Sequence, residues 1–264
     1  MTQSIIEIRD LVTYYASRKI LDGIDLEIYP GETLAILGRS GCGKSTLLRH
    51  IVGLTPPTSG HIYIKGQDIT KLNEEQRLPT LKKIGMLFQS SALFNSMTVG
   101  DNVALPLREH TRLEDPTIQI MTRMKLDQVG LAGFEDFMPA QLSGGMKKRA
   151  ALARAIAMDP DILFCDEPSA GLDPIVAVGI DQLIMKLKKA FKMTIVVVTH
   201  ELASVFLIAD RVALLDKGKI IAIGTPAELK NSDNEKVIQF FNRIPDPERI
   251  DKHEYLNSLT GNNK

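Results

Sequence analysis

The segment at residues 38–45, with the sequence GRSGCGKS, combines closely spaced glycines with a lysine and a hydroxyl residue. It follows an aliphatic run at Leu34–Leu37 and leads into a helical pattern from Lys44, an order that argues against a simple glycine-rich turn. Glycines let backbone N–H groups turn inward around an anion, and a helix N-terminus adds partial positive charge there. The Lys44 ammonium would reach the β- and γ-phosphates of a nucleotide, and the Ser45 hydroxyl would bind magnesium. The predicted nucleotide-binding residues of this loop are Gly38, Arg39, Ser40, Gly41, Cys42, Gly43, Lys44, Ser45 and Thr46.

Two carboxylates, Asp166 and Glu167, follow the apolar run Ile162–Cys165. Ligands of open α/β sheets bind at the carboxyl ends of the strands. Asp166 would hold the magnesium directly or through water, and Glu167 would orient or deprotonate the attacking water. Such a pair on its own is more often a solvated strand end, but the phosphate loop upstream favours the catalytic role.

Two further polar residues come after apolar runs. His200 follows Ile195–Val198, and Gln89 follows Ile84–Phe88. Each of them alone is more often a structural residue. Together with the phosphate loop and the carboxylates, however, they would end four strands in groups that can bind phosphate or metal.

The elements that must position these groups are predicted by the hydrophobic pattern. Aliphatic runs without alternation are typical of strands buried on both faces of a parallel sheet. They occur at Leu34–Leu37, Ile162–Cys165 and Ile195–Val198, and helical patterns between them cover Lys44–Leu54, Gly145–Met158 and Ile175–Phe191. Proline pairs or single prolines follow or precede these helices, and the first helix is expected to stop at Pro56-Pro57. The order of strands and helices indicates an α/β fold.

Additional segments divide the chain. Ile5–Ile8, Ile24–Ile28 and His61–Ile64 alternate more and predict an antiparallel flank. We therefore expect an α/β core at 1–89 and 162–230, a helical insertion subdomain at 90–161, and a C-terminal helix and tail at 231–264. Apolar residues in Glu235–Ile244 share one helical face, which predicts core packing, with a partner contact as the alternative. Asp251–Lys264 is polar enough to be a flexible end or an arm that orders on binding.

The composition and the hydrophobic pattern argue against several classes of protein. With 32 basic and 32 acidic residues among 264, no net charge attracts nucleic acid. No apolar run approaches the roughly 20 residues that cross a bilayer, and the N-terminal sequence lacks a secretory pattern, so we expect a cytosolic chain. Cys42 and Cys165 lie within the two nucleotide-site segments and not in a metal-type or redox-type pair, so we expect them to be small apolar fillers.

The motif LSGGM at residues 142–146 precedes the helix KKRAALARAIA and lies shortly before Asp166. With the phosphate loop and Gln89 upstream, this order resembles the ATP-binding-cassette (ABC) ATPase family, up to about residue 230. The resemblance implies a phosphate-loop NTPase fold of the RecA-like type that hydrolyses ATP with Mg2+. It also implies a head-to-tail homodimer, in which Ser143 and Gly145 of one chain contact the γ-phosphate held by Lys44 of the other. The implied signature residues are Leu142, Ser143, Gly144, Gly145 and Met146, and the implied D-loop residues are Gly171, Leu172 and Asp173.

The same resemblance suggests roles for single residues. Tyr15, expected just ahead of a flank strand, is similar to the aromatic residue that stacks on adenine, with Tyr14 as a substitute. Gln89 resembles the residue that senses the γ-phosphate and links it to a membrane subunit, and His200 resembles the switch histidine. The predicted catalytic residues are thus Lys44, Gln89, Glu167 and His200, and the predicted magnesium ligands are Ser45, Gln89 and Asp166. The basic residues after the motif, namely Lys147, Lys148, Arg149 and Arg154, are expected to form an ordinary solvated face.

A narrower resemblance rests on the segments LFQSSALF at 87–94, DNVA at 101–104 and PLREHT at 106–111. They are similar to the ATPases of Mla-type phospholipid transporters. The resemblance implies a MlaE-like permease dimer, an MCE-domain lipid-binding subunit and a small STAS-domain protein as partners, at the cytoplasmic face of a bacterial inner membrane. It also makes residues 90–111 a docking surface, although core and loop packing is the simpler explanation.

Other functions stay open at this point. The chain could be the ATPase of another MCE-type lipid system. It could also be a soluble cofactor-assembly ABC ATPase, since those subunits are likewise small and have one cassette. Repair and translation ATPases need a long coiled-coil insertion or two cassettes, which the sequence lacks. A GTPase-like switch is supported by the phosphate loop alone.

Overall fold

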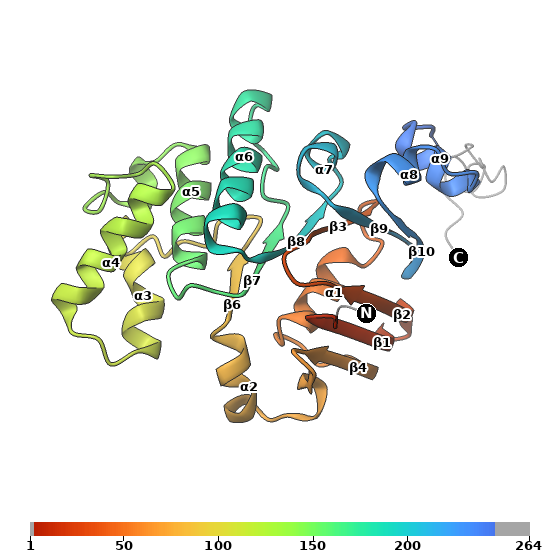
Figure 1. Ribbon diagram of the computed structural model, residues 1–264, viewed down its shortest axis with the longest axis horizontal. Helices are drawn as coiled ribbons and strands as arrows, with labels where there is room; N and C mark the ends of the chain where they lie inside the picture. The colour runs from red at the N-terminus through yellow and green to blue at the C-terminus, as the bar shows by residue number, and fades with distance from the viewer. Residues whose placement is uncertain (1–2, 246–264) are drawn as a thin grey trace, which may run out of the picture.

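Two β-sheets form the centre of the protein in the computed structural model, which describes residues 3–245 (Figure 1). The larger sheet has the strand order β10-β9-β3-β8-β7-β6. Its strands are β3 (Thr33–Gly38), β6 (Ile84–Leu87), β7 (Ile162–Asp166), β8 (Thr194–Thr199), β9 (Arg211–Asp216) and β10 (Lys219–Gly224). All neighbouring pairs are parallel except β9 with the edge strand β10. The predicted α/β class with a parallel core is confirmed.

The smaller sheet is antiparallel, as expected for the flank, and has the order β2-β1-β4-β5. Its strands are β1 (Ile6–Tyr15), β2 (Arg18–Ile28), β4 (Ser59–Ile64) and β5 (Gln67–Asp68). Strands β1 and β2 are longer than their apolar alternation suggests, because register shifts interrupt the alternation after Ile8 and again after Leu11. Tyr15 is therefore the last residue of β1 and does not lie ahead of a strand in a separate connection.

Helices surround the larger sheet. They are α1 (Lys44–Ile51), α2 (Glu74–Leu81), α3 (Val99–His110), α4 (Asp115–Gln128), α5 (Gly144–Ala155), α6 (Pro174–Phe191), α7 (Leu202–Ile208), α8 (Pro226–Lys230) and α9 (Glu235–Phe241), with short 3-10 turns η1 (Ile69–Lys71) and η2 (Pro139–Gln141). Helices α3 to α5 form one end of the molecule, and α8 and α9 form the other (Figure 1). Within residues 3–245, no helix is both long and apolar enough to cross a bilayer.

Helix α1 ends earlier than the predicted stop at Pro56-Pro57. Gly53 has a positive φ of 73°, its N–H donates to His50 O, and the N–H of Leu54 donates to Arg49 O. This pair of bonds is the Schellman motif, in which a left-handed glycine ends a helix. The helix therefore ends at Ile51.

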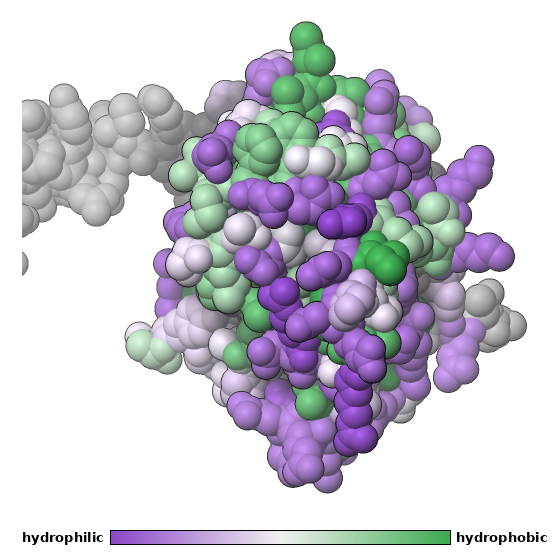
Figure 2. Space-filling view, turned by 90° about the vertical axis from the view of Figure 1, so that its left-hand side faces the viewer, coloured by the Kyte–Doolittle hydropathy of each residue, from purple (hydrophilic) through white to green (hydrophobic). Residues whose placement is uncertain are grey.

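The helices at residues 90–161 share an apolar core with the sheet. In β7, Leu163 and Cys165 join the cluster that also contains Val103 of α3 and Leu152 of α5, whereas Phe164 joins the cluster on the other face. This alternation explains why β7 is apolar at every position. The outer surface at the α3–α4 end is mainly hydrophilic with scattered apolar patches (Figure 2). The exact boundaries of a helical subdomain stay a prediction.

The C-terminal helix α9 ends at Phe241, before the predicted Ile244. Val237 is fully buried in a cluster that includes Val205 of α7, with Phe240 and Phe241 packed against it. Ile244, by contrast, is half exposed. The predicted arm at Asp251–Lys264 lies outside the described residues.

Candidate functional site

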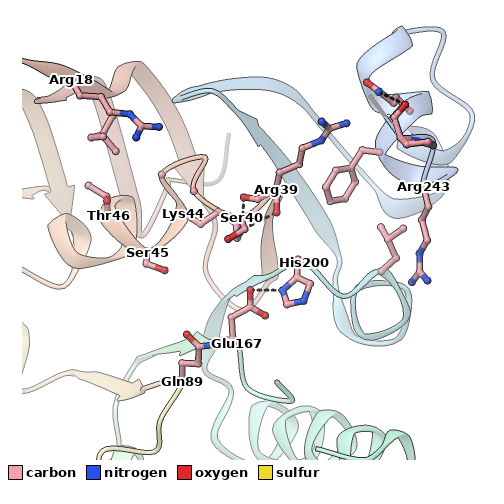
Figure 3. Close-up of a pocket in the computed structure, with 18 of the residues that line it drawn as sticks. Arg18, Arg39, Ser40, Lys44, Ser45, Thr46, Gln89, Glu167, His200 and Arg243 are labelled. Atoms are coloured by element: carbon pink, nitrogen blue, oxygen red, sulfur yellow. Dashed lines mark hydrogen bonds and ion pairs between the residues drawn. The ribbon is translucent and has the colours of Figure 1, made fainter. Parts of the chain in front are cut away.

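The carboxyl ends of the central strands open onto one cavity of about 850 Å³ (Figure 3). The loop after β3, Gln89 after β6, Glu167 after β7 and His200 after β8 all reach it. Its lining includes the predicted residues Tyr15, Gly38, Arg39, Ser40, Gly41, Gly43, Lys44, Ser45, Thr46, Gln89, Glu167 and His200. The topology therefore brings together groups from Gly38 to His200, up to 162 residues apart in the chain, because parallel strands end at the same edge of a sheet.

The loop before α1 requires its glycines. Gly43 has a φ of 110°, and an added Cβ would lie 2.8 Å from Leu21 Cδ2 and 3.1 Å from the carbonyl oxygen of Ile20. Lys44 is buried, and its ammonium donates to the carbonyl oxygens of Gly38 (2.8 Å) and Arg39 (3.0 Å). The loop thus surrounds a positive charge at a helix N-terminus, an arrangement suited to phosphate.

Cys42 differs from the other residues of the loop. Its side chain is buried in the apolar cluster behind the loop and does not line the cavity. Burial raises the pKa of this thiol and likewise that of Cys165. Both free cysteines are thus neutral packing residues, as expected, and Cys42 can serve a ligand only through its backbone.

Two of the three predicted magnesium ligands, Ser45 and Asp166, are placed to hold such an ion, whereas the role of Gln89 stays a prediction. Ser45 Oγ lies 3.5 Å from Asp166 Oδ1, so two hard oxygen donors from different elements face one point. Burial and the neighbouring carboxylate of Glu167 raise the pKa of Asp166, and a bound cation would counter both effects. Within residues 3–245, no group of three or more acidic, histidine or cysteine side chains is placed to hold a metal ion.

Glu167 is held from three directions. Its backbone N–H donates to Val198 O at 2.8 Å, and its carboxylate accepts bonds from Thr199 Oγ1 at 3.1 Å and from His200 Nδ1 at 2.8 Å. The ion pair with His200 is visible in Figure 3. The carboxylate is 11% exposed, and the histidine is half exposed. Strand β8 therefore orients the candidate base. Thr199, the last residue of β8, was not identified from the sequence, although this residue directly precedes the predicted site residue His200.

Of the two tyrosines, only Tyr15 reaches the cavity. It is half exposed and lies beside Arg18 and Ile20, which line the same wall. The ring of Tyr14 instead receives the ammonium of Lys19, 5.5 Å from its centroid, and is absent from the lining. Tyr14 is therefore not placed as a substitute for Tyr15, because adjacent residues of a strand face opposite sides.

The LSGGM segment does not reach the cavity of its own chain. Leu142 is buried, and Ser143 caps α5 by accepting a bond from the Met146 N–H at 3.3 Å. A Cβ added to Gly144 would lie 3.3 Å from Leu172 Cδ2, and one added to Gly145 would lie 2.6 Å from Val176. The signature and D-loop segments thus pack against each other.

Within the D-loop, Asp173 has a structural task as well. Its carboxylate accepts bonds from the N–H groups of Ile175 and Val176 and thereby caps α6. Gly171 adopts a φ of 77° in the preceding turn. Neither residue lines the phosphate-loop cavity.

The prediction of a solvated basic face after the signature is wrong for Lys148, Arg149 and Arg154, whereas Lys147 is partly exposed. The Lys148 ammonium is buried and donates to Gln89 O and Glu167 O. Arg149 donates to Val129 O, and Arg154 donates to Ser91 O and Ala92 O. Backbone carbonyls of neighbouring loops attract these cations inward, an effect that a sequence pattern does not reveal.

The cavity has a further wall that the sequence did not predict. Phe240, Arg243 and Ile244, at the end of α9 and just after it, also line the cavity, and Arg243 lies on the side opposite Gln89. Arg243 and Arg39 both appear on this side in Figure 3. The only sequence signal was the apolar face of Glu235–Ile244, which points to packing rather than to a site.

A phosphate-binding loop between β3 and α1, carboxylates at the end of β7 and a parallel sheet define the protein as a phosphate-loop NTPase. Residues 21–170 match the family model described as ABC transporter. The chain is 45% identical over 240 residues to the intermembrane phospholipid transport system ATP-binding protein MlaF of Haemophilus influenzae, covering 91% of each chain. The chain therefore belongs to the ABC transporter family, as an ATP-hydrolysing member that uses Mg2+.

Two other similarities are informative. A probable ribonucleotide transport ATP-binding protein, mkl, of Mycobacterium leprae is 40% identical over 90% of this chain and 68% of its own length. A dimeric ATP-binding cassette solved in a post-hydrolysis state with ADP and Pi superimposes with a TM-score of 0.78 at 31% identity, over 84% of this chain and 98% of that one.

Proposed function

We propose that this chain is the ATPase subunit of an ABC transporter that moves phospholipids between the inner and outer membranes of a bacterium. The observation that carries the proposal is the 45% identity to a phospholipid-transport ATPase, because it extends over 91% of both chains. The partners would be a MlaE-like permease dimer, an MCE-domain subunit and a small STAS-domain protein. The chain would then act at the cytoplasmic face of the inner membrane.

Two copies of the chain would form the working unit. Ser143 and Gly144 are exposed and lie outside the cavity that contains Lys44 of the same chain. A helix N-terminus with small residues can approach a phosphate closely and add donors and dipole charge. The dimeric state of the structural relative supports the same arrangement.

Within each site, the residues would divide the work. Lys44 and the loop N–H groups would hold the phosphates, and Tyr15 would stack on the base. Glu167 would orient and deprotonate the attacking water, with Thr199 and His200 keeping its carboxylate in place. Magnesium, held by Ser45 and Asp166 with Gln89 nearby, would neutralise charge on the phosphates.

The permease would dock beside Gln89. A groove of about 570 Å³ lies between α2, β6, α3 and α5 and is mainly apolar. Its lining includes Leu78, Met86, Phe88, Ala92, Phe94, Pro106, His110 and Met158. Phe94 is half exposed, and Asn102 fixes its loop by exchanging bonds with both the N–H and the carbonyl of Phe94. The groove would accept an apolar helix from the membrane partner.

Purification from a detergent extract of bacterial membranes tests the proposal. We expect the tagged chain to recover an integral-membrane protein and an MCE-domain protein, and a Phe94→Asp variant to lose both while still binding ATP. The complex in phospholipid vesicles should transfer labelled phospholipid only with ATP. Recovery of soluble partners alone would contradict the proposal and favour a cofactor-assembly ATPase.

Ribonucleotide transport is a second candidate, favoured by the 40% identity to the mycobacterial protein. The purified complex distinguishes the two. If ribonucleotides other than ATP are carried across the vesicle membrane and labelled phospholipid is not, the second candidate replaces the first.

A further inference from the structure

Helix α5 carries a buried cation that contacts both sides of the candidate active site. Lys148 is 4% exposed and lies two residues after the signature segment. Its Nζ donates to Gln89 O at 2.6 Å and to Glu167 O at 3.2 Å. One ammonium therefore joins the loop after β6, the residue after β7 and helix α5.

The chemistry of Lys148 is unusual for a stabilising group. Both acceptors are neutral backbone carbonyls, whereas buried ammonium groups are normally paired with a carboxylate. An apolar side chain would fill the same space without the desolvation cost. The useful property of the ammonium is that its donors can bind two carbonyls from separate strands at once.

A second cation of α5 restrains the rest of the loop after Gln89. Arg154 donates to Ala92 O at 2.7 Å and to Ser91 O at 2.8 Å. Ser91 and Ala92 have positive φ values of 65° and 48°, a conformation that costs energy in non-glycine residues. Three carbonyls between residues 89 and 92 are thus bound to one helix.

We propose that Lys148 is a positioning residue for ATP hydrolysis, which sets the separation of Gln89 and Glu167 by binding both of their carbonyls to the signature helix. Lys148 does not touch the nucleotide. Its loss lets Gln89 and Glu167 shift independently, and shifts of about 1 Å in such groups can slow a reaction about 100-fold.

The position of Lys148 has a consequence for the dimer, and this part rests on the proposed function. The N-terminus of α5 would face the nucleotide of the partner, while Lys148 on the same helix holds residues of its own site. A shift of α5 caused by the partner's nucleotide would then reach Gln89 and Glu167 directly. Lys148 would connect the two nucleotide sites of the head-to-tail dimer.

The test compares Lys148→Met, Lys148→Gln and Lys148→Arg with wild type. Methionine is one atom shorter than lysine, stays unbranched and removes every donor, and glutamine keeps a shorter amide donor. Arginine keeps the charge and two or more donors. We expect Lys148→Met to lower kcat by about 100-fold with little change in the KM for ATP, Lys148→Gln to lower it less, and Lys148→Arg to restore most of the rate.

A matched control separates positioning from general destabilisation. Lys125 is another buried lysine of the helical region, and it pairs with Asp159 and the ring of Phe191, far from the cavity lining. Lys125→Met should lower the melting temperature at least as much as Lys148→Met while keeping kcat near wild type. If Lys148→Met proves too unstable to measure, the comparison is made with Lys148→Gln.

Three outcomes would overturn the proposal: a wild-type kcat in both Lys148→Met and Lys148→Gln, a raised KM with unchanged kcat, or equal losses of kcat in the Lys125 and Lys148 variants. Hydrolysis is measured on the full chain in its purified complex and on the chain alone. Failure of phospholipid transfer by the wild type would contradict the proposed function without affecting the ratio of kcat values between variants.

Discussion

The backbone at Glu167 has a φ of 48°, in the left-handed region that non-glycine residues rarely adopt. A glutamate gains nothing from this conformation. Glu167 is kept in it by the bond from its N–H to Val198 O and by the two bonds that its carboxylate accepts. The conformation directs the carboxylate toward His200 and the cavity. At the scale of single residues, the site therefore depends on strain that the neighbouring strand β8 maintains.

Replacing Glu167 by Gln should separate binding from hydrolysis. The amide keeps the shape and can still accept the bond from Thr199, but it is not a base. We expect ATP binding to persist and kcat to fall by at least about 100-fold, within the range of general-base catalysis. Single-turnover assays with labelled ATP measure the rate of hydrolysis. Lys44→Ala, which removes the charge from the phosphate loop, should instead abolish ATP binding. Wild-type turnover in Glu167→Gln would refute the assignment of the base.

The buried carboxyl of Asp181 in α6 provides a second prediction at this scale. Ser204 Oγ donates to its Oδ2, whereas Oδ1 has no partner among the described residues. Burial raises the pKa of Asp181. The folded protein thus holds this proton more tightly than the unfolded chain, so the free energy of unfolding falls as pH rises from the ordinary aspartate pKa through the raised one, and then levels off.

Asp181→Asn removes this titration while keeping an oxygen for Ser204. At neutral pH the variant should be more stable than wild type by on the order of 1 kcal/mol, and the difference should vanish below the ordinary aspartate pKa. Urea unfolding at several pH values measures it. Ser204→Ala, which leaves both carboxyl oxygens without a donor, should be destabilised by about 1–3 kcal/mol. A variant Asp181→Asn that is less stable at neutral pH would contradict the argument.

At the scale of elements, the close packing of β6 against α5 controls where Gln89 and Lys148 meet. A Cβ added to Gly85 of β6 would lie 2.4 Å from the carbonyl oxygen of Ala155 at the end of α5. Backbone atoms cannot yield as a flexible side chain can. The strand and the helix approach each other this closely only because residue 85 is glycine.

Gly85→Ala should therefore push β6 and α5 apart. We expect a loss of about 1–3 kcal/mol in the free energy of unfolding, as in other overpacked sites. A lower kcat should accompany it, since the two elements carry Gln89 and Lys148. Gly179→Ala in α6 is the matched control, because its Cβ would meet only Arg149 Nη2 at 3.7 Å, and it should be neutral or slightly stabilising. Equal behaviour of the two variants would show that the contact at Gly85 is easily relieved.

At the scale of the whole molecule, the phosphate loop and the signature segment, which we propose as the two halves of a nucleotide site, lie apart within one chain. The phosphate loop lines the cavity. The signature segment lies at the exposed N-terminus of α5 and caps that helix. A second copy in head-to-tail orientation would bring each half opposite its complement. ATP would then act as the bridge between chains.

Charge at Ser143 tests this assembly. Asp and Asn both cap helices well, so Ser143→Asp and Ser143→Asn should preserve the start of α5. In a Glu167→Gln background with ATP, we expect the Asn variant to elute as a dimer in size-exclusion chromatography. The Asp variant should remain monomeric with ATP bound, because its carboxylate would face the partner's γ-phosphate. Dimers of equal stability in both variants would contradict the sandwich arrangement.

Several features could be derived from sequence because they depend on neighbours in the chain. The glycine spacing before Lys44, the carboxylates after Ile162–Cys165 and the apolar runs of the central strands are local patterns, and parallel strands bring their ends to one edge in any such fold. The α/β class and the nucleotide-binding loop followed from these patterns. The early end of α1 at Ile51 was also within reach, because Gly53 is a local signal.

Other features were decided only by the tertiary structure. Whether a lysine of α5 is solvated or buried depends on carbonyls of Gln89 and Glu167, which lie 59 and 19 residues away. Which tyrosine lines the cavity depends on the face that β1 turns toward the phosphate loop, and packing of α9 brought Arg243 to another wall. In each case the side chain's environment is made by distant segments. Sequence specifies which groups are present, whereas the fold determines which of them meet.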